Sequence, residues 1–134
     1  MSYIRQMFES HPHDPSSDHA KSVECITACY ACHETCNACA DACLSEDDVT
    51  HQVACIRKNM DCADVCLATA KVVSRITATD KKLVGDLLRA CITACEHCAE
   101  ECGKHSEMMK HCAICAEACR RCEDACAALL ESLS

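Results

Sequence analysis

The chain is poor in the residues that turns, strands and aromatic cores require. Among its 134 residues there are two glycines, two prolines, two tyrosines, one phenylalanine and no tryptophan. Glycine and proline are the strongest signals of turns, so their scarcity argues against a fold of many short strands joined by turns. Ala, Cys, Glu, Lys and Leu are prominent in the rest of the chain, and this composition suits helices. The sequence therefore predicts an all-α protein.

Positive charge and long apolar runs are also scarce. Acidic residues outnumber Lys and Arg by 21 to 13, which gives a net charge of −8 and argues against nucleic acid or an anionic membrane as a partner. No apolar run approaches the roughly 18 residues of a membrane span. No basic segment followed by an apolar one marks a signal peptide. We expect one cytoplasmic domain with no membrane or nucleic-acid partner.

Cysteine, in contrast, is abundant, with 18 copies. Within four groups the cysteines are mostly three or four residues apart, which is the spacing of the buried face of a helix, where Leu and Ile are usual. These groups, the cysteine stripes, are Cys25, Cys29, Cys32, Cys36, Cys39 and Cys43; Cys55, Cys62 and Cys66; Cys91, Cys95, Cys98 and Cys102; and Cys112, Cys115, Cys119, Cys122 and Cys126. The stripes predict a helical bundle with a core of thiols.

Four long helices would carry the stripes, over about residues 17–44, 49–77, 81–102 and 107–131. Ser17 or Asp18 and Asp80 are suitable N-caps, and Gly103 would follow the last residue of the third helix as its C′ residue. Short connections between long helices predict an antiparallel up-down-up-down four-helix bundle over residues 17–134. Residues 1–16 form a separate tail, in which residues 1–9 can form a short amphipathic helix.

The antiparallel order gives the bundle two different ends. One end, which we call the mouth, gathers the soft or basic ligands His51, His105, Met108, Met109 and His111, with Cys43, Cys55, Cys102 and Cys112 just inside. The other end, the aliphatic plug, gathers Val72, Val73, Ile76, Leu83, Val84, Leu87, Leu88, Leu129, Leu130 and Leu133. The sulfur column would therefore open at the mouth and be closed at the plug.

Disulfides do not explain the stripes. A reducing compartment keeps thiols free, and Cβ atoms at i,i+3 or i,i+4 on a helix are roughly 5–6 Å apart, whereas a disulfide needs about 3.5–4.5 Å. Packing alone does not explain them either, because a thiol fills less volume than the Leu it replaces. A column of free thiols points instead to soft metal ions.

Cu(I) fits best among the soft metals, since it prefers thiolates and accepts low coordination. If each thiolate bridges two ions and each ion holds two thiolates, about 18 Cu(I) neutralise the column, which avoids a buried net charge. Zn(II) or a mixed-metal buffer is the alternative and would use discrete tetrahedral sites. A thiol redox enzyme is less favoured, because it needs one accessible, activated thiol. We expect a non-catalytic store.

The other candidate ligands have ordinary interpretations as well. At the mouth, His51, His105 and His111 are either ligands or plain surface residues. His33 and His97 lie one position off the stripes, which indicates surface positions. Met60 lies beside a stripe, which indicates a packing role. Asn59 lies on the stripe of the second helix. It is either a hydrogen-bonded core residue or a weak ligand.

The segments CIRKNMDCADVC (55–66) and EECGKHSEMMKHCAICAEAC (100–119), together with the four stripes, resemble the bacterial cytosolic copper storage proteins. The resemblance covers about residues 20–130. It implies a homotetramer of four-helix bundles, many Cu(I) along each interior, and loading at the Cys/His end. We expect a copper chaperone as the donor. His105 and His111 match histidines of that family, and Met108 and Met109 are less typical of it.

Overall fold

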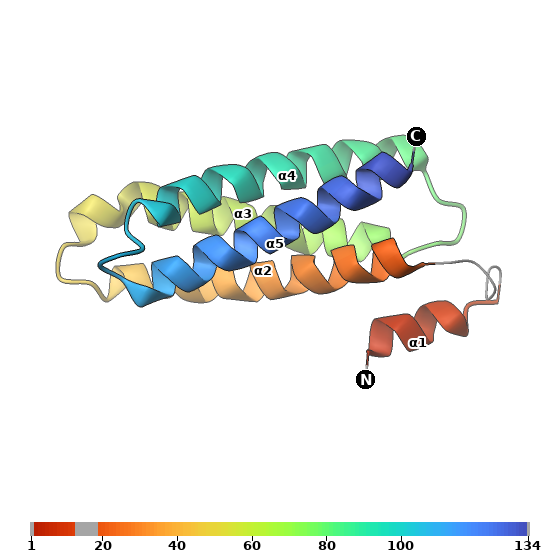
Figure 1. Cartoon of the computed structure of the whole chain (residues 1–134), viewed down its shortest axis with the longest axis horizontal. Helices are drawn as coiled ribbons and strands as arrows, with labels where there is room; N and C mark the ends of the chain where they lie inside the picture. The colour runs from red at the N-terminus through yellow and green to blue at the C-terminus, as the bar shows by residue number, and fades with distance from the viewer. Residues whose placement is uncertain (1, 13–18, 134) are drawn as a thin grey trace.

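The computed structural model describes residues 2–12 and 19–133. Its elements are α1 (Tyr3–Glu9), α2 (Ala20–Leu44), the 3-10 turn η1 (Val49–Gln52), α3 (Val53–Val73), α4 (Lys81–Gly103) and α5 (Lys110–Ser132). No strand occurs in these two ranges. Figure 1 shows the long helices α2 to α5 lying along one axis and running in alternating directions, with α1 beside the bundle. The predicted all-α four-helix bundle is confirmed.

Each long helix packs against two others, so that the four form a square. α2 contacts α3 and α5, and α4 contacts the same two helices. This arrangement turns one face of every helix inward, and the stripes fill those faces. Within the described residues, no helix is both long and apolar enough to cross a bilayer.

Helix ends are where the sequence-based boundaries differ most from the structure. Asp80 caps α4 as predicted, since its Oδ1 accepts the backbone N–H of Leu83 at 3.1 Å. The prediction for Gly103 was wrong: it is the last residue of α4 and does not have a positive φ. The chain leaves α4 through Lys104 in a right-handed conformation (φ −64°). The proposed N-caps Ser17 and Asp18 lie outside the described residues.

The second and fourth helices are shorter than predicted. α3 ends at Val73, and its C-cap is Ser74, whose hydroxyl donates to the Ala70 carbonyl at 2.6 Å. Ala78 in the connection has a positive φ of 52°. α5 begins at Lys110, three residues late, because Met109 is extended (φ −130°, ψ 112°).

The aliphatic plug forms at the end that the sequence assigned to it. Val73, Val84, Leu88 and Leu129 are buried, and most of the other members pack against them; Leu83 is 48% exposed. The N-terminal helix α1 adds an unexpected member. Its Phe8 is buried, in the continuous hydrophobic cluster that contains both the plug residues and the stripe cysteines. The plug is therefore a conventional hydrophobic core at one end of the sulfur column.

The position of Met60 differs from the one predicted. It was expected to pack beside the stripe of α3, but it is 53% exposed. The neighbouring position, Asn59, takes the inward direction instead and is completely buried.

Candidate metal centre: the sulfur column

All 18 stripe cysteines are free, buried thiols. Seventeen have no exposed area, and Cys39, near the mouth, is 2% exposed. This is the distribution that the 3–4 spacing predicts when every stripe faces the same interior. The side chains therefore form one column along the bundle axis, shielded from solvent.

Neighbouring sulfurs in the column are within contact distance both along and across helices. Along a helix, the Sγ atoms of Cys32 and Cys36 are 3.7 Å apart. Between helices, Cys36 Sγ lies 3.6 Å from Cys119 Sγ, and Cys55 Sγ lies 3.6 Å from Cys102 Sγ. These distances exceed the roughly 2.05 Å of a disulfide bond. They are those of thiols held side by side.

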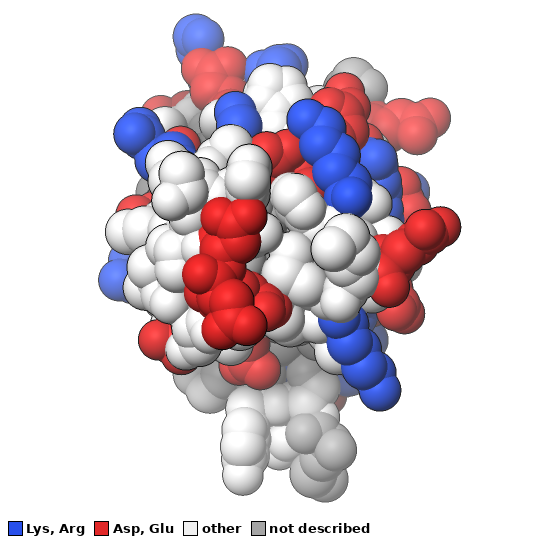
Figure 2. Space-filling model, turned by 90° about the vertical axis from the view of Figure 1, so that its left-hand side faces the viewer, with Lys and Arg blue, Asp and Glu red and all other residues white. Residues whose placement is uncertain are grey.

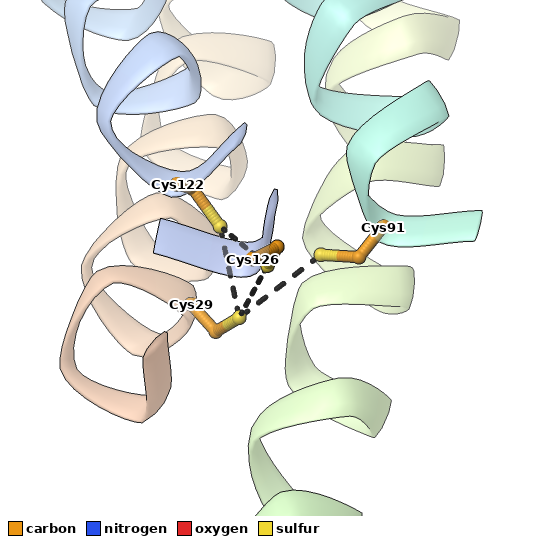
Figure 3. Close-up of side chains that lie close together, drawn as sticks. All are labelled: Cys29, Cys91, Cys122 and Cys126. Carbon is orange, nitrogen blue, oxygen red and sulfur yellow. Dashed lines mark hydrogen bonds between the residues drawn. The ribbon is translucent and has the colours of Figure 1, made fainter. Parts of the chain in front are cut away.

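The sulfurs form groups with the geometry of metal sites, in which all ligand atoms lie within 4.8 Å of one another. Figure 3 shows one such group, in which Cys29 of α2, Cys91 of α4, and Cys122 and Cys126 of α5 point toward a common centre. Three further groups are Cys32, Cys66, Cys95 and Cys122; Cys32, Cys36, Cys62 and Cys119; and Cys36, Cys98, Cys115 and Cys119.

The groups are not separate, because they share sulfurs. Cys122 belongs to the first and second groups, Cys32 to the second and third, and both Cys36 and Cys119 to the third and fourth. A thiolate that serves two adjacent groups must bridge metal ions. The geometry is therefore that of a connected chain of sites.

Asn59 interrupts the sulfur column with an amide. Its Oδ1 accepts from the thiols of Cys115 at 2.9 Å and Cys98 at 3.2 Å. Its Nδ2 lies 3.5 Å from Cys55 Sγ. Of the two interpretations left open by the sequence, the hydrogen-bonded core residue describes the metal-free protein.

Burial and mutual hydrogen bonding set the protonation of the column. At the mouth, desolvation raises the pKa of Cys43 to about 11 and that of Cys112 to about 12. At the plug end, hydrogen bonds from Cys126 and Cys29 lower the pKa of Cys25 to about 5. The pKa of Cys29 is raised, with its hydrogen bond to Cys122 as the largest cause. Cys43 and Cys112 thus retain their protons at neutral pH.

His111 is the mouth residue that the structure brings against the sulfurs. Its Nδ1 lies 3.3 Å from Cys39 Sγ and 3.7 Å from Cys112 Sγ. With Cys39, Cys43 and Cys112 it forms a fifth group of potential ligands. On its other side, Nε2 lies 2.9 Å from Glu46 Oε2.

The other predicted mouth residues lie farther out. His51 is exposed, and its Nδ1 pairs with the Asp48 carboxylate. Met108 is 88% exposed. His105 is half-buried, and Met109 is half-buried against the core. These four residues surround the mouth, whereas His111 lies at its inner edge.

The two histidines beside the stripes turn away from the sulfurs, as predicted. His33 is half-buried, and its Nδ1 lies 2.9 Å from the Ala63 carbonyl oxygen, so it bridges α2 and α3. His97 is exposed.

Sequence reasoning missed two residues near the mouth. Gln52 is buried, and its Oε1 has no hydrogen-bond partner among the described residues. Its position three residues before Cys55 continues the stripe of α3 and could have identified it. Glu46 looked like an ordinary turn residue, and no local pattern connects it with His111.

Comparisons with known proteins agree with the interpretation of the sulfur column as a chain of metal sites. Residues 18–131 match the copper storage protein family. The chain belongs to the copper storage protein family. It resembles a copper storage protein from Streptomyces lividans loaded with 10 copper equivalents, with 46% identity, coverage of 96% of this chain and 98% of that one, and a TM-score of 0.92.

A cytosolic copper storage protein from the same organism, carrying five coppers, is 51% identical over 83% of this chain and 92% of its own, with a TM-score of 0.82. No curated protein sequence matches the chain significantly. As a copper storage protein, the chain uses its Cys-lined interior to hold copper, and the predicted storage role is confirmed.

Proposed function

We propose that this copper storage protein holds copper as Cu(I), in a continuous column of bridging thiolates with about one ion per cysteine, or roughly 18 per chain. The observation that carries the proposal is the sharing of Cys32, Cys36, Cys119 and Cys122 between adjacent groups. A bridging thiolate lets neighbouring ions use the same sulfur, so capacity is set by the number of cysteines.

Distances and charge both favour Cu(I). Two metal–sulfur bonds in line span about 4.6 Å if each is close to 2.3 Å, and the sulfurs of Cys32 and Cys36 are 3.7 Å apart in the metal-free state. A small rotamer change therefore admits the ion. One monovalent ion for each thiolate leaves the buried column neutral.

Zn(II) remains the competing cargo, because each group offers four sulfurs. A zinc site consumes four ligands of its own, so the shared sulfurs would leave room for only a few ions. A thiol redox role is less favoured, since 17 of the 18 thiols have no exposed area and a reactive cysteine must be accessible.

We further propose that copper is loaded at the mouth. The ion would pass from the outer residues His51, His105, Met108 and Met109 to His111 and then to the cysteines of the column. Imidazole and thioether hold Cu(I) less firmly than thiolate and suit a transfer step. The aliphatic plug offers no such ligands. A copper chaperone is the expected donor.

The cellular setting follows from resemblance. A similar protein from Streptomyces lividans is described as cytosolic, which supports our proposal that this chain works in the cytoplasm. We also expect a homotetramer of bundles, the assembly implied by the family.

Anaerobic titration with Cu(I) against a chromophoric chelator tests the capacity. Saturation at roughly 18 ions per chain supports the thiolate column. Saturation at about four to six would support discrete sites instead. A parallel titration with Zn(II) should saturate well below one ion per cysteine.

A further inference from the structure

His111 lies where solvent and the sulfur column meet. The side chain is 27% exposed, and it lines a groove of about 600 Å³ between α2 and α5, together with Glu34, Ala38, Cys39 and Ile114. Cys39, the one stripe cysteine with any exposed area, lies in the same groove. An ion that reaches the groove meets the imidazole and this thiol first.

The two ring nitrogens of His111 have different partners. Nδ1 faces the sulfurs of Cys39 and Cys112, at 3.3 and 3.7 Å. Nε2 faces Glu46 Oε2 at 2.9 Å. Glu46 belongs to the connection between α2 and η1, where its backbone N–H donates to the Cys43 carbonyl at 3.2 Å. The backbone of Glu46 is thus held against the end of the helix that carries Cys39 and Cys43.

The chemistry of the two partners fixes the tautomer of a neutral ring. An ionised carboxylate can only accept a hydrogen bond, so the Nε2 beside Glu46 must carry the proton. Nδ1 then has a free lone pair, and it faces thiols, which can donate to it. That lone pair is the one that a metal ion would use.

We propose that Glu46 is a positioning residue for copper loading, which holds the His111 ring with its Nδ1 lone pair directed at Cys39 and Cys112. The inference rests on the proposed function, in which His111 passes copper into the column. A carboxylate on the far nitrogen of a metal-binding histidine orients the ring and increases its basicity as a ligand.

The pair of Asp48 and His51 provides a contrast on the same connection. There the carboxylate pairs with Nδ1 of an exposed imidazole, and both side chains are more than half exposed. Acidic side chains also occupy the centre of the mouth end in Figure 2. Acidic side chains at the mouth can attract cations without orienting the His111 ring. The experiment must therefore distinguish electrostatic attraction from orientation of the ring.

Nitrogen-15 NMR of the reduced, metal-free protein at pH 8 measures the tautomer. In the wild type, His111 should be in the Nε2–H form. Glu46→Ala should give a mixture of tautomers, because the ring loses its acceptor. Glu46→Gln should lie between them, since an amide can present either its oxygen or its NH2 group. A wild-type ring in the Nδ1–H form would overturn the proposal.

Stopped-flow loading from a Cu(I)–chelator complex under anaerobic conditions measures the consequence. Glu46→Ala should slow the first phase about tenfold, the lower end of the usual effect of removing a partner of a metal-binding histidine. Total capacity should not change. Across the wild type and the Gln and Ala variants, the rates should decrease in the same order as the populations of the Nε2–H tautomer.

Two controls separate positioning from attraction. Glu34→Ala removes a carboxylate from the same groove and should leave the rate unchanged, because the Glu34 side chain makes no hydrogen bond among the described residues. In a double-mutant cycle, Glu46→Ala should have no effect once His111 is replaced by Ala. Equal slowing by the Glu34 and Glu46 variants, or an undiminished Glu46 effect without His111, would overturn the proposal.

The outcome also separates this inference from the storage mechanism. If the wild type fails to bind Cu(I) at about one ion per cysteine, the thiolate column is wrong. If the wild type fills as proposed but Glu46→Ala loads at the same rate, the column stands and the positioning role of Glu46 is rejected.

Discussion

At the residue scale, cysteine serves as both core residue and ligand. A protonated thiol packs as a small hydrophobe, so the column can be buried before any metal arrives. A polar side chain within the column still needs hydrogen-bond partners. Asn59 illustrates this, because its amide accepts from the thiols of Cys98 and Cys115 and its Nδ2 lies near Cys55.

Replacing Asn59 by Ala should destabilise the metal-free protein by about 1–3 kcal/mol, because buried thiols lose their acceptor and a cavity remains. Urea denaturation under reducing conditions measures the change. Met60→Ala is the matched control, since Met60 is adjacent but 53% exposed. An Asn59→Ala variant as stable as the control would show that the amide contributes no net stability.

At the element scale, caps decide where the long helices begin. α4 starts at Lys81 because Asp80 precedes it in an extended conformation (φ −91°, ψ 98°) and accepts the N–H of Leu83. The start of α4 matters for the plug, since Val84 and Leu88 occupy its first two turns and are buried.

Asp80→Ala should lower the free energy of unfolding by about 0.5–2 kcal/mol, the usual cost of losing an N-cap. Thermal unfolding of the reduced, metal-free protein measures this change. Asp47→Ala removes the same charge from an exposed turn and serves as the control. A similar loss in both variants would attribute the effect to charge rather than to capping.

At the scale of the whole molecule, the two ends of the bundle have different tasks. The plug and α1 supply an apolar core that does not depend on metal, whereas the column and the mouth supply ligands. Long amphipathic helices gain most of their stability from such packing. The fold can therefore exist with an empty column.

The metal-free, reduced protein should already be helical. Circular dichroism tests this prediction, and a random-coil spectrum that becomes helical only with copper would contradict it. Loading should then raise the melting temperature, because copper binds the native state preferentially. In this respect the protein should differ from zinc fingers, which fold on metal binding.

Copper loading should also release protons. Desolvation raises the pKa of Cys43 to about 11 and of Cys112 to about 12, from an ordinary value of 9.0. Both thiols are protonated at pH 7, so a bound ion must displace their protons. Apparent affinity should therefore increase with pH up to these pKa values.

Titration in weak buffer with a pH indicator measures the release. A Cys43→Ala/Cys112→Ala variant should release two fewer protons per chain when filled. Loading of the wild type without acidification would contradict the assignment of these thiols as protonated.

The sequence by itself determined the helices, the stripes and the class of metal. Helical periodicity is a local property, so the 3–4 spacing of Cys25 to Cys43 is sufficient to place six thiols on one face. The preference of thiolate for soft ions belongs to the residue type. The antiparallel order also followed from the sequence, because short connections leave no other arrangement.

Only the tertiary structure decided which residues meet. Glu46 and His111 are 65 positions apart, and the sharing of Cys32 or Cys122 between groups depends on how α2 to α5 are aligned. The stripe already placed Asn59 inward, but its contacts with the thiols of Cys98 and Cys115 come only from the packing of α3 against α4 and α5. Such distances arise between segments remote in the chain, and no local pattern of residues encodes them.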